Sequence, residues 1–157
     1  MHRSLWLYHT DTGSSRQITS GMFDDCTPSF DPAGNYLFFT STRNYSAPTF
    51  SVVSRNFIYS NEEALVAVPL RKDVASPLST NDRPKEGKSA GKLVIDVDGF
   101  EARSVRLPVE GWAIEGLEVT SEGNPAYIQL KIGVPRTLKI FDLKNRKERT
   151  ASRYRSA

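Results

Sequence analysis

The chain has 157 residues, enough for one domain, and its 38% hydrophobic and 25% charged residues are ordinary for a soluble globular protein. Its net charge of +3 is mildly basic and only weakly indicates an anionic partner, and no apolar run is long enough to span a bilayer. The single cysteine, Cys26, excludes an internal disulfide and leaves the redox compartment open. The opening residues lack the long apolar core of a signal peptide.

Short apolar runs, separated by glycine, proline, asparagine and aspartate, dominate the chain and predict an all-β fold. No segment sustains a helical period of apolar residues. The runs predict strands near residues 4–9, 15–19, 27–31, 35–41, 64–70, 92–97, 102–108, 114–120, 126–132 and 137–142. The first and fourth strands are apolar on both faces, which favours sheets stacked face to face over a sheet with one face in water.

Residues 25–43 carry the most informative local pattern in the chain. Pro28 opens a short strand, residues 31–34 form a tight turn, and residues 36–41 form a second strand. This arrangement is typical of the inner half of a β-propeller blade, which is a four-stranded unit that cannot fold alone. We therefore expect a piece of a larger ring.

A strand–turn–strand plan recurs along the sequence and supports this interpretation. It is present in residues 5–19, 93–107 and 138–150, and Leu93 and Leu138 lie 45 positions apart, close to the expected blade period of about 40–45 residues. The sequence thus predicts a β-propeller segment of about two and a half four-stranded antiparallel blades in an incomplete ring.

The predicted blades divide the chain as follows. Residues 1–20 form the outer half of a blade, residues 21–110 a complete blade with a mobile insertion at about 71–91, residues 111–150 most of a further blade, and residues 151–157 a basic tail. The insertion is expected to be mobile because it has almost no large apolar side chains with which to offset its chain entropy. Within the central blade two alternatives remain: residues 92–97 extend the strand at 64–70, or residues 92–107 form a separate outer hairpin.

Two and a half blades cannot close a ring, so we expect two uncovered blade faces. One would expose Leu5, Trp6, Leu7 and Tyr8, and the other Leu138, Ile140 and Phe141. Large apolar side chains left in water promote association. The isolated chain is therefore expected to associate with itself, or to fold fully only beside the rest of its propeller.

No constellation for catalysis is evident, so we predict no catalytic residue. Serine or cysteine nucleophiles need a histidine base, yet the two histidines, His2 and His9, lie near the N-terminus, and Cys26 has no local histidine partner. The segment beginning at Asp96 resembles the start of a calcium loop, but position twelve is Leu107 instead of glutamate. We predict no metal site and no cofactor, and we expect Asp24 or Asp25 to hydrogen-bond a nearby loop.

Candidate binding residues are few. The basic residues after position 144 lack interleaved aromatics apart from Tyr154 and are expected to form a solvated edge, so no nucleic-acid or membrane partner is predicted. Tyr45, Phe50 and Arg136 are the candidates for contacting a peptide.

Three pieces in order, residues 24–44, 66–78 and 95–109, resemble the propeller region of tricorn-type serine peptidases. The Asp-x-x-Pro-x-Phe-Asp-Pro-x-Gly element at 25–34 is shared with TolB-like propellers, whereas the ordered set is more specific. The resemblance covers about residues 20–150.

The resemblance implies large modular enzymes that cut short peptides, with two propellers ahead of a PDZ-like module and the catalytic domains. The propellers are thought to act as substrate filter and product exit, and the nucleophile and its histidine lie in C-terminal domains, so no catalytic residue is carried over to this chain. The implied function is a noncatalytic propeller segment in substrate gating, peptide channelling and subunit scaffolding. Implied partners are the rest of the propeller, the peptidase domains, peptides and further copies in a homo-oligomer, and the cytoplasm is the favoured compartment without excluding export. The alternative is a TolB-like or WD-type binding module attached to another enzyme or complex.

Overall fold

The computed structural model describes residues 2–43, 49–51, 56–58, 63–79, 93–110, 113–131 and 133–153. Within these ranges the chain is all-β, apart from one short 3-10 turn, η1 (Glu101–Arg103). The strands are β1 (Trp6–His9), β2 (Ser14–Gln17), β3 (Asp25–Phe30), β4 (Tyr36–Ser41), β5 (Thr49–Ser51), β6 (Asn56–Ile58), β7 (Ala64–Pro69), β8 (Val105–Arg106), β9 (Ala113–Val119), β10 (Pro125–Lys131), β11 (Val134–Asp142) and β12 (Lys147–Arg153). No helix in the described ranges is long and apolar enough to cross a membrane.

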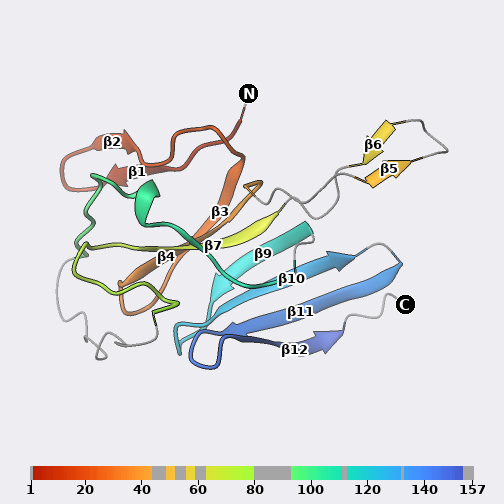
Figure 1. The fold of residues 1–157 in the computed structure, drawn as a ribbon. Coiled ribbons are helices and arrows are strands. Elements are labelled where there is room, and N and C mark those ends of the chain that lie inside the picture. The colour runs from red at the N-terminus through yellow and green to blue at the C-terminus, as the bar shows by residue number, and fades with distance from the viewer. Residues whose placement is uncertain are drawn as a thin grey trace.

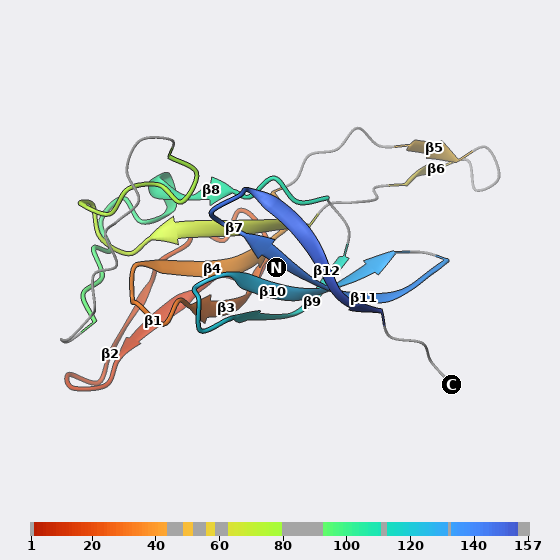
Figure 2. The same ribbon diagram turned by 90° about the horizontal axis from the view of Figure 1, so that it is seen from below.

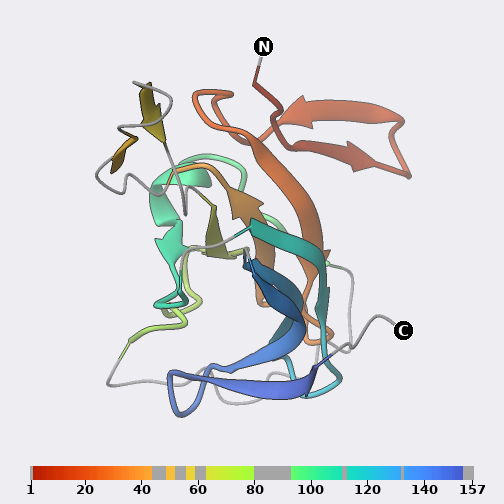
Figure 3. The same cartoon turned by 90° about the vertical axis from the view of Figure 1, so that its right-hand side faces the viewer.

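Two four-stranded antiparallel sheets form the body of the molecule. The central sheet has the order β3-β4-β7-β8, and the second sheet has the order β9-β10-β11-β12. The β1–β2 hairpin and the second sheet lie on opposite sides of the central sheet (Figure 1, Figure 3), while the β5–β6 hairpin projects away from both sheets (Figure 2). Two stacked four-stranded sheets and a further hairpin confirm the prediction of a partial β-propeller with about two and a half blades.

The core lies in two layers, one on each face of the central sheet. β4 and β7 are buried along their whole lengths, which confirms the prediction that residues 36–39 have no wet side. The same prediction for residues 5–8 is wrong, because Trp6 and Tyr8 on β1 are exposed. Alternate side chains point to opposite faces because a strand has a period of two. The layer between the central sheet and the second sheet contains Tyr36, Phe38, Leu65, Ala67, Ile114, Leu117, Tyr127 and Phe141. The layer between the central sheet and the β1–β2 hairpin contains Leu5, Ile18, Leu37, Phe39, Val66, Val68 and Phe100.

The turn between β3 and β4 is organised by a buried aspartate. One carboxylate oxygen of Asp31, Oδ1, accepts hydrogen bonds from the backbone N–H groups of Asn35 at 2.6 Å and Tyr36 at 3.0 Å. The Gly34 N–H donates to the Asp31 carbonyl at 3.0 Å, and Gly34 has a φ of 68°, in the left-handed region that glycine adopts freely. The predicted tight turn at 31–34 is therefore present.

β3 is irregular at its start. Its register against β4 shifts between Cys26 and Ser29, and Thr27 between them has a φ of 48°. The Thr27 hydroxyl lies 2.9 Å from the hydroxyl of Thr40 on β4, which fixes this β-bulge to the neighbouring strand. Register shifts are also present between β9 and β10 and between β11 and β12.

The outer part of the central sheet differs from the predicted strands. β7 is the third strand, as one alternative held, but residues 93–97 form no strand and the fourth strand is only Val105–Arg106. The reason is a contact between segments distant in the sequence: the Asp96 carboxylate accepts a hydrogen bond from the Lys72 N–H at 2.8 Å, and the Asp96 N–H donates to the Leu70 carbonyl at 2.8 Å. These bonds attach the segment to the loop that follows β7 rather than to a strand ladder.

The predicted insertion and tail are only partly described. Residues 71–79 form turns in which Val74 is buried, and the Tyr36 hydroxyl donates to the Ala75 carbonyl at 2.9 Å. Residues 80–91 lie outside the described residues, so the mobility of the insertion stays a prediction. β12 continues the ladder with β11 to Arg153, so residues 151–153 belong to a strand and not to a tail. Ala151 and Ser152 are exposed, as suits an edge strand.

The prediction of two uncovered blade faces is only partly right. Leu5 is buried against the central sheet and Phe141 is fully buried between the two sheets, so neither lies on an open face. Trp6, Tyr8 and Leu138 are exposed, as expected. Strand alternation explains the difference, because neighbouring side chains on one strand point to opposite faces.

Replacing Gly34 with valine should destabilise the protein by about 1–3 kcal/mol, since a β-branched residue is strained at a positive φ. Gly34→Asn is the matched control, because asparagine tolerates the left-handed region far better. Gly87→Val, in the predicted insertion, should also cost less than Gly34→Val. Urea denaturation midpoints measure all three, and equal midpoints for the two Gly34 variants would contradict the turn geometry.

Candidate functional site

The most highly connected polar group of the described residues is the Arg43 cluster, which lies where the central sheet meets the β1–β2 hairpin. Its members are Asp25 at the start of β3, Ser41 at the end of β4, Arg43 two residues later, Glu101 in η1 and Ser104 after η1. Residues far apart in the sequence are thus brought together around one guanidinium group.

Arg43 uses most of its donors inside this cluster. Nη2 donates to both carboxylate oxygens of Asp25, at 3.0 and 3.1 Å, and lies 3.3 Å from Oε1 of Glu101. Nε donates to the Ser41 hydroxyl at 2.7 Å, and Nη1 donates to the Ser104 hydroxyl at 3.1 Å. The Asp25 side chain is fully buried, so the charge of Arg43 compensates a carboxylate that water does not reach.

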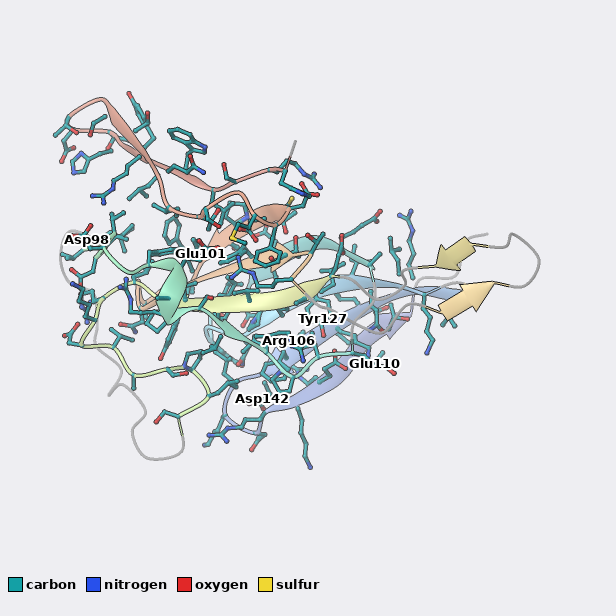
Figure 4. The ribbon with its side chains drawn as sticks, turned by 45° about the horizontal axis from the view of Figure 1, so that its top comes forward. Asp98, Glu101, Arg106, Glu110, Tyr127 and Asp142 are labelled. Carbon is teal, nitrogen blue, oxygen red and sulfur yellow. The ribbon has the colours of Figure 1, made fainter. Side chains whose placement is uncertain are left out.

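Aromatic rings and a second set of hydrogen bonds complete the Arg43 cluster. The guanidinium carbon lies 5.1 Å from the ring centroid of Phe23 and 5.4 Å from that of Phe39, within the range of cation–π attraction. The Glu101 carboxylate also accepts the backbone N–H of Ser20 at 2.8 Å. Glu101 therefore links the segment after β2 to the central sheet (Figure 4).

A second polar group, the Tyr127 cluster, lies between the two sheets. The hydroxyl of Tyr127 on β10 donates a hydrogen bond to Oε1 of Glu148 on β12, and Nζ of Lys139 on β11 lies 3.0 Å from Oε2 of the same carboxylate. Burial raises the pKa of Tyr127 strongly, and the Glu148 hydrogen bond and the charge of Glu110 raise it further. Figure 4 labels Tyr127 and Glu110 near one another at the second sheet.

Both clusters hold groups in place and lack the arrangement for covalent chemistry. A serine or cysteine nucleophile requires a base within hydrogen-bond reach. Arg43 acts only as a hydrogen-bond donor, and the Ser41 and Ser104 hydroxyls contact it rather than a base. Neither do the described residues contain a group of acidic, histidine or cysteine side chains that could bind a metal ion.

The residues considered in the sequence as a base or a nucleophile make contacts that hold local structure. His2 Nδ1 lies 3.3 Å from the Asp24 carboxylate, and His9 Nδ1 lies 3.3 Å from the N–H of Thr12, in the turn after β1. Burial raises the pKa of the Cys26 thiol, which disfavours the reactive thiolate.

The acidic residues examined in the sequence also serve local structure. Asp24 accepts a hydrogen bond from the backbone N–H of Arg3 at 2.8 Å, and this bond and that of His2 lower its pKa. Asp25 binds Arg43 instead of a loop. Asp98 and Gly99 form a turn in which Gly99 has a φ of 70°, as expected of an aspartate and a glycine that supply a bend.

The three candidate peptide contacts are only partly described. Tyr45 lies outside the described residues, and Phe50 belongs to β5, paired with Phe57 on β6. Arg136 lies on β11 with 61% of its side chain exposed, and its Nη1 is 3.5 Å from Glu115 on β9. A role of these residues in peptide binding stays a prediction.

Part of this chain is similar in sequence to two tricorn protease homologues. No family model matches the chain. A putative tricorn protease homolog 2 from Streptomyces coelicolor is 27% identical over 129 residues, which cover 73% of this chain and 11% of that protein. A tricorn protease homolog from Saccharolobus solfataricus is 30% identical over 108 residues, which cover 69% of this chain and 10% of that protein. The chain thus spans about a tenth of the length of these curated relatives.

One solved structure shares the fold of this chain. The crystal structure of the tricorn protease superposes with a TM-score of 0.72 and 18% sequence identity, covering 93% of this chain and 15% of that one. TolB from Acinetobacter baumannii covers 96% of this chain and 38% of its own, but its TM-score of 0.30 is too low to bear on the fold.

Replacing Arg43 with methionine should lower the free energy of unfolding by about 3–5 kcal/mol, because it leaves the buried Asp25 carboxylate without its counter-charge. The double variant Arg43→Met/Asp25→Leu should recover part of this loss. Arg3→Met is the control, since its ion pair with Asp24 is largely exposed and should contribute less than about 1 kcal/mol. Chemical denaturation measures the series, and equal effects at Arg3 and Arg43 would contradict the assigned role.

The buried tyrosines predict a loss of stability in alkali. An unfolded tyrosine ionises near pH 10, whereas burial raises the pKa of Tyr36 to about 12 and also raises that of Tyr127. Above about pH 10 ionisation therefore favours the unfolded chain, and the free energy of unfolding should fall as the pH rises.

Tyr127→Phe should flatten this fall, whereas Tyr8→Phe, at an exposed position, is the control. Denaturation curves between pH 8 and about 11.5 measure the slopes, a range chosen to bracket the tyrosine pKa. A slope that Tyr127→Phe leaves unchanged would show that the phenol does not titrate as its burial requires.

Proposed function

Because the chain is a tricorn-type β-propeller segment, we propose that it is a noncatalytic part of a tricorn-like serine peptidase and contributes to gating and channelling peptides and to scaffolding the subunits. The coarse assignment rests on similarity to the tricorn protease homologues and on the shared fold. The gating, channelling and scaffolding roles are the proposed extension.

The face-to-face stack of sheets is the observation that best supports this role. Each sheet covers an apolar face of its neighbour, so the described residues of the two sheets and the β1–β2 hairpin form a stack with a buried apolar layer at each contact. A stack of this kind can guide peptides past its edges without altering them. The polar clusters contribute by fixing neighbouring layers to one another.

The end of the molecule that carries β5 and the β10–β11 turn is the proposed peptide contact. β5 and the start of β11 lie toward this same end in both views (Figure 1, Figure 2), and Phe50 belongs to β5 and Arg136 to β11. Aromatic side chains bind apolar peptide side chains, and a guanidinium group binds a carboxylate in bidentate geometry. Arg136 is exposed enough to accept such a carboxylate in addition to Glu115.

The purified chain should show no peptidase activity on short fluorogenic peptides. The described contacts of His2 and His9 are to Asp24 and to the Thr12 backbone, which gives a nucleophile no general base. Turnover that survives stringent purification and is abolished by a serine-directed inhibitor would contradict this expectation.

Short peptides should nevertheless bind, and Arg136→Ala should weaken their binding by about three- to tenfold, as expected for the loss of one exposed charge-assisted contact. Arg149→Ala on β12 is the control, because it removes an exposed arginine at another edge of the sheet. Calorimetric titration with tetrapeptides that end in a free carboxylate measures the affinities. Equal losses for both variants would indicate nonspecific charge attraction, and the absence of saturable binding would overturn the proposal.

A further inference from the structure

The side chain of Gln129 on β10 is buried, yet its amide nitrogen lacks a hydrogen-bond partner among the described residues. Gln129 is 6% exposed, and its Nε2 atom is enclosed. Leaving a buried N–H donor unpaired costs the free energy of removing it from water, so such groups almost always have a partner. The chain's other glutamine, Gln17, is the usual case, because its Nε2 donates to the Thr19 carbonyl at 2.8 Å. Gln129 therefore calls for an acceptor beyond the described side chains and backbone.

Gln129 lies in a row of side chains that faces the central sheet. Its partners on the neighbouring strands are Ile114 on β9 and Thr137 on β11, and residues directly opposite one another share a face of the sheet. Ile114 belongs to the apolar layer against the central sheet, so Gln129 and Thr137 face inward as well. Both are buried. Two polar side chains thus lie next to each other inside the stack.

The hydroxyl of Thr137 is the acceptor best placed to help this amide. Its one proton is used, since Oγ1 donates to the Pro135 carbonyl at 2.9 Å, but the hydroxyl oxygen can still accept. Gln129 Nε2 does not reach it directly. A donor that needs an acceptor and a hydroxyl that can still accept, on directly opposite residues, are the two partners that a bridging water requires.

The ladder between β10 and β11 is interrupted directly beside Gln129. Regular pairing stops at Gln129–Thr137 and resumes at Lys131–Val134, so residues 135 and 136 stand opposite residue 130 alone. A bulge breaks the ladder locally, and Pro135 has no N–H with which to restore it. Backbone groups left out of a ladder are bonded by side chains or by water, as the Thr137 hydroxyl already does for the Pro135 carbonyl.

The central sheet is polar at the facing end of this layer as well. Thr40 on β4 is buried and pairs with Leu65, which lies in the same apolar layer. Glu63, two residues before Leu65, reaches across to the second sheet and accepts the backbone N–H of Ile114. Ordered water occupies polar sites inside proteins and leaves apolar ones dry. Polar groups from both sheets make this end of the layer suitable for water.

We propose that one water molecule is bound between the two sheets, where it accepts a hydrogen bond from Gln129 Nε2 and donates one to Thr137 Oγ1. Water is the ligand because the amide and the hydroxyl are both uncharged, whereas a buried ion would need a counter-charge. The hydrogen bonds then run from Gln129 through the water and Thr137 to the Pro135 carbonyl, and they tie β10 to β11 across the bulge. This site does not depend on the proposed role in peptide handling.

A crystal structure of the natural sequence that shows ordered water tests the site directly. One water is expected within about 3.2 Å of both Gln129 Nε2 and Thr137 Oγ1. In solution, the Gln129 amide protons should show nuclear Overhauser effects to a long-lived water, and Thr137→Val should weaken them. A protein group bonded to Nε2, or an amide without a long-lived water, would overturn the proposal.

Two variants test the same water by stability. Gln129→Met keeps the side-chain length and Thr137→Val keeps the shape, and each should lower the urea midpoint by about 0.3–1 M. Gln17→Met and Thr150→Val, at exposed strand positions, are the matched controls and should have smaller effects. The double variant Gln129→Met/Thr137→Val should lose less than the sum of the single losses, because both remove one shared bridge.

The opposite signs are equally informative. A midpoint that Gln129→Met raises or leaves unchanged would mean that the amide is unpaired in the natural protein, since methionine removes a buried donor without a partner. Strictly additive losses would mean that Gln129 and Thr137 share no bridge. Either result rejects the water. If a variant fails to fold, the Overhauser measurement on the natural sequence still decides.

Discussion

Burial of the central sheet on both faces is the constraint on which the rest of the structure depends. β4 and β7 have no solvated side, so the fold is stable only when an apolar layer covers each face. The β1–β2 hairpin supplies one layer and the second sheet the other. Because each face of the central sheet needs an apolar layer, three layers stack on one another. The chain therefore resembles successive blades of a propeller and not a sandwich of two sheets.

The two polar clusters set the position of the layers that the apolar contacts hold together. Apolar burial is not directional, whereas a guanidinium group with fixed donors accepts only one arrangement of its partners. Arg43 joins β3 to η1, and Glu101 joins η1 to the segment that follows β2. Tyr127, through Glu148, connects inner and outer strands of the second sheet. The apolar residues thus provide most of the attraction between layers, and the polar clusters determine how the layers are oriented.

Much of the fold could be predicted because strand period and turn chemistry are local. The residues within 36–39 and within the Asp31–Gly34 turn are sufficient to predict a two-sided apolar strand and a tight turn, and both are present. The strand expected at 92–97 failed because a distant group, the Lys72 N–H, competes for Asp96. Arg43 and Glu101 were missed for the same reason, since no spacing in the sequence relates residues 25, 43 and 101. The available signal was an arginine just after a buried strand, with an aspartate at the start of the preceding strand.

The bulge at Thr27 has a consequence for how molecules of this kind avoid the wrong contacts. β3 is an edge strand, and an even edge would template hydrogen bonding with any extended chain. The left-handed residue at position 27 bends that edge, the β9 and β12 ladders are also offset, and β8 is only two residues long. Strand-by-strand growth toward fibrils is thereby hindered, so the backbone steers encounters between molecules away from sheet edges and toward side-chain surfaces.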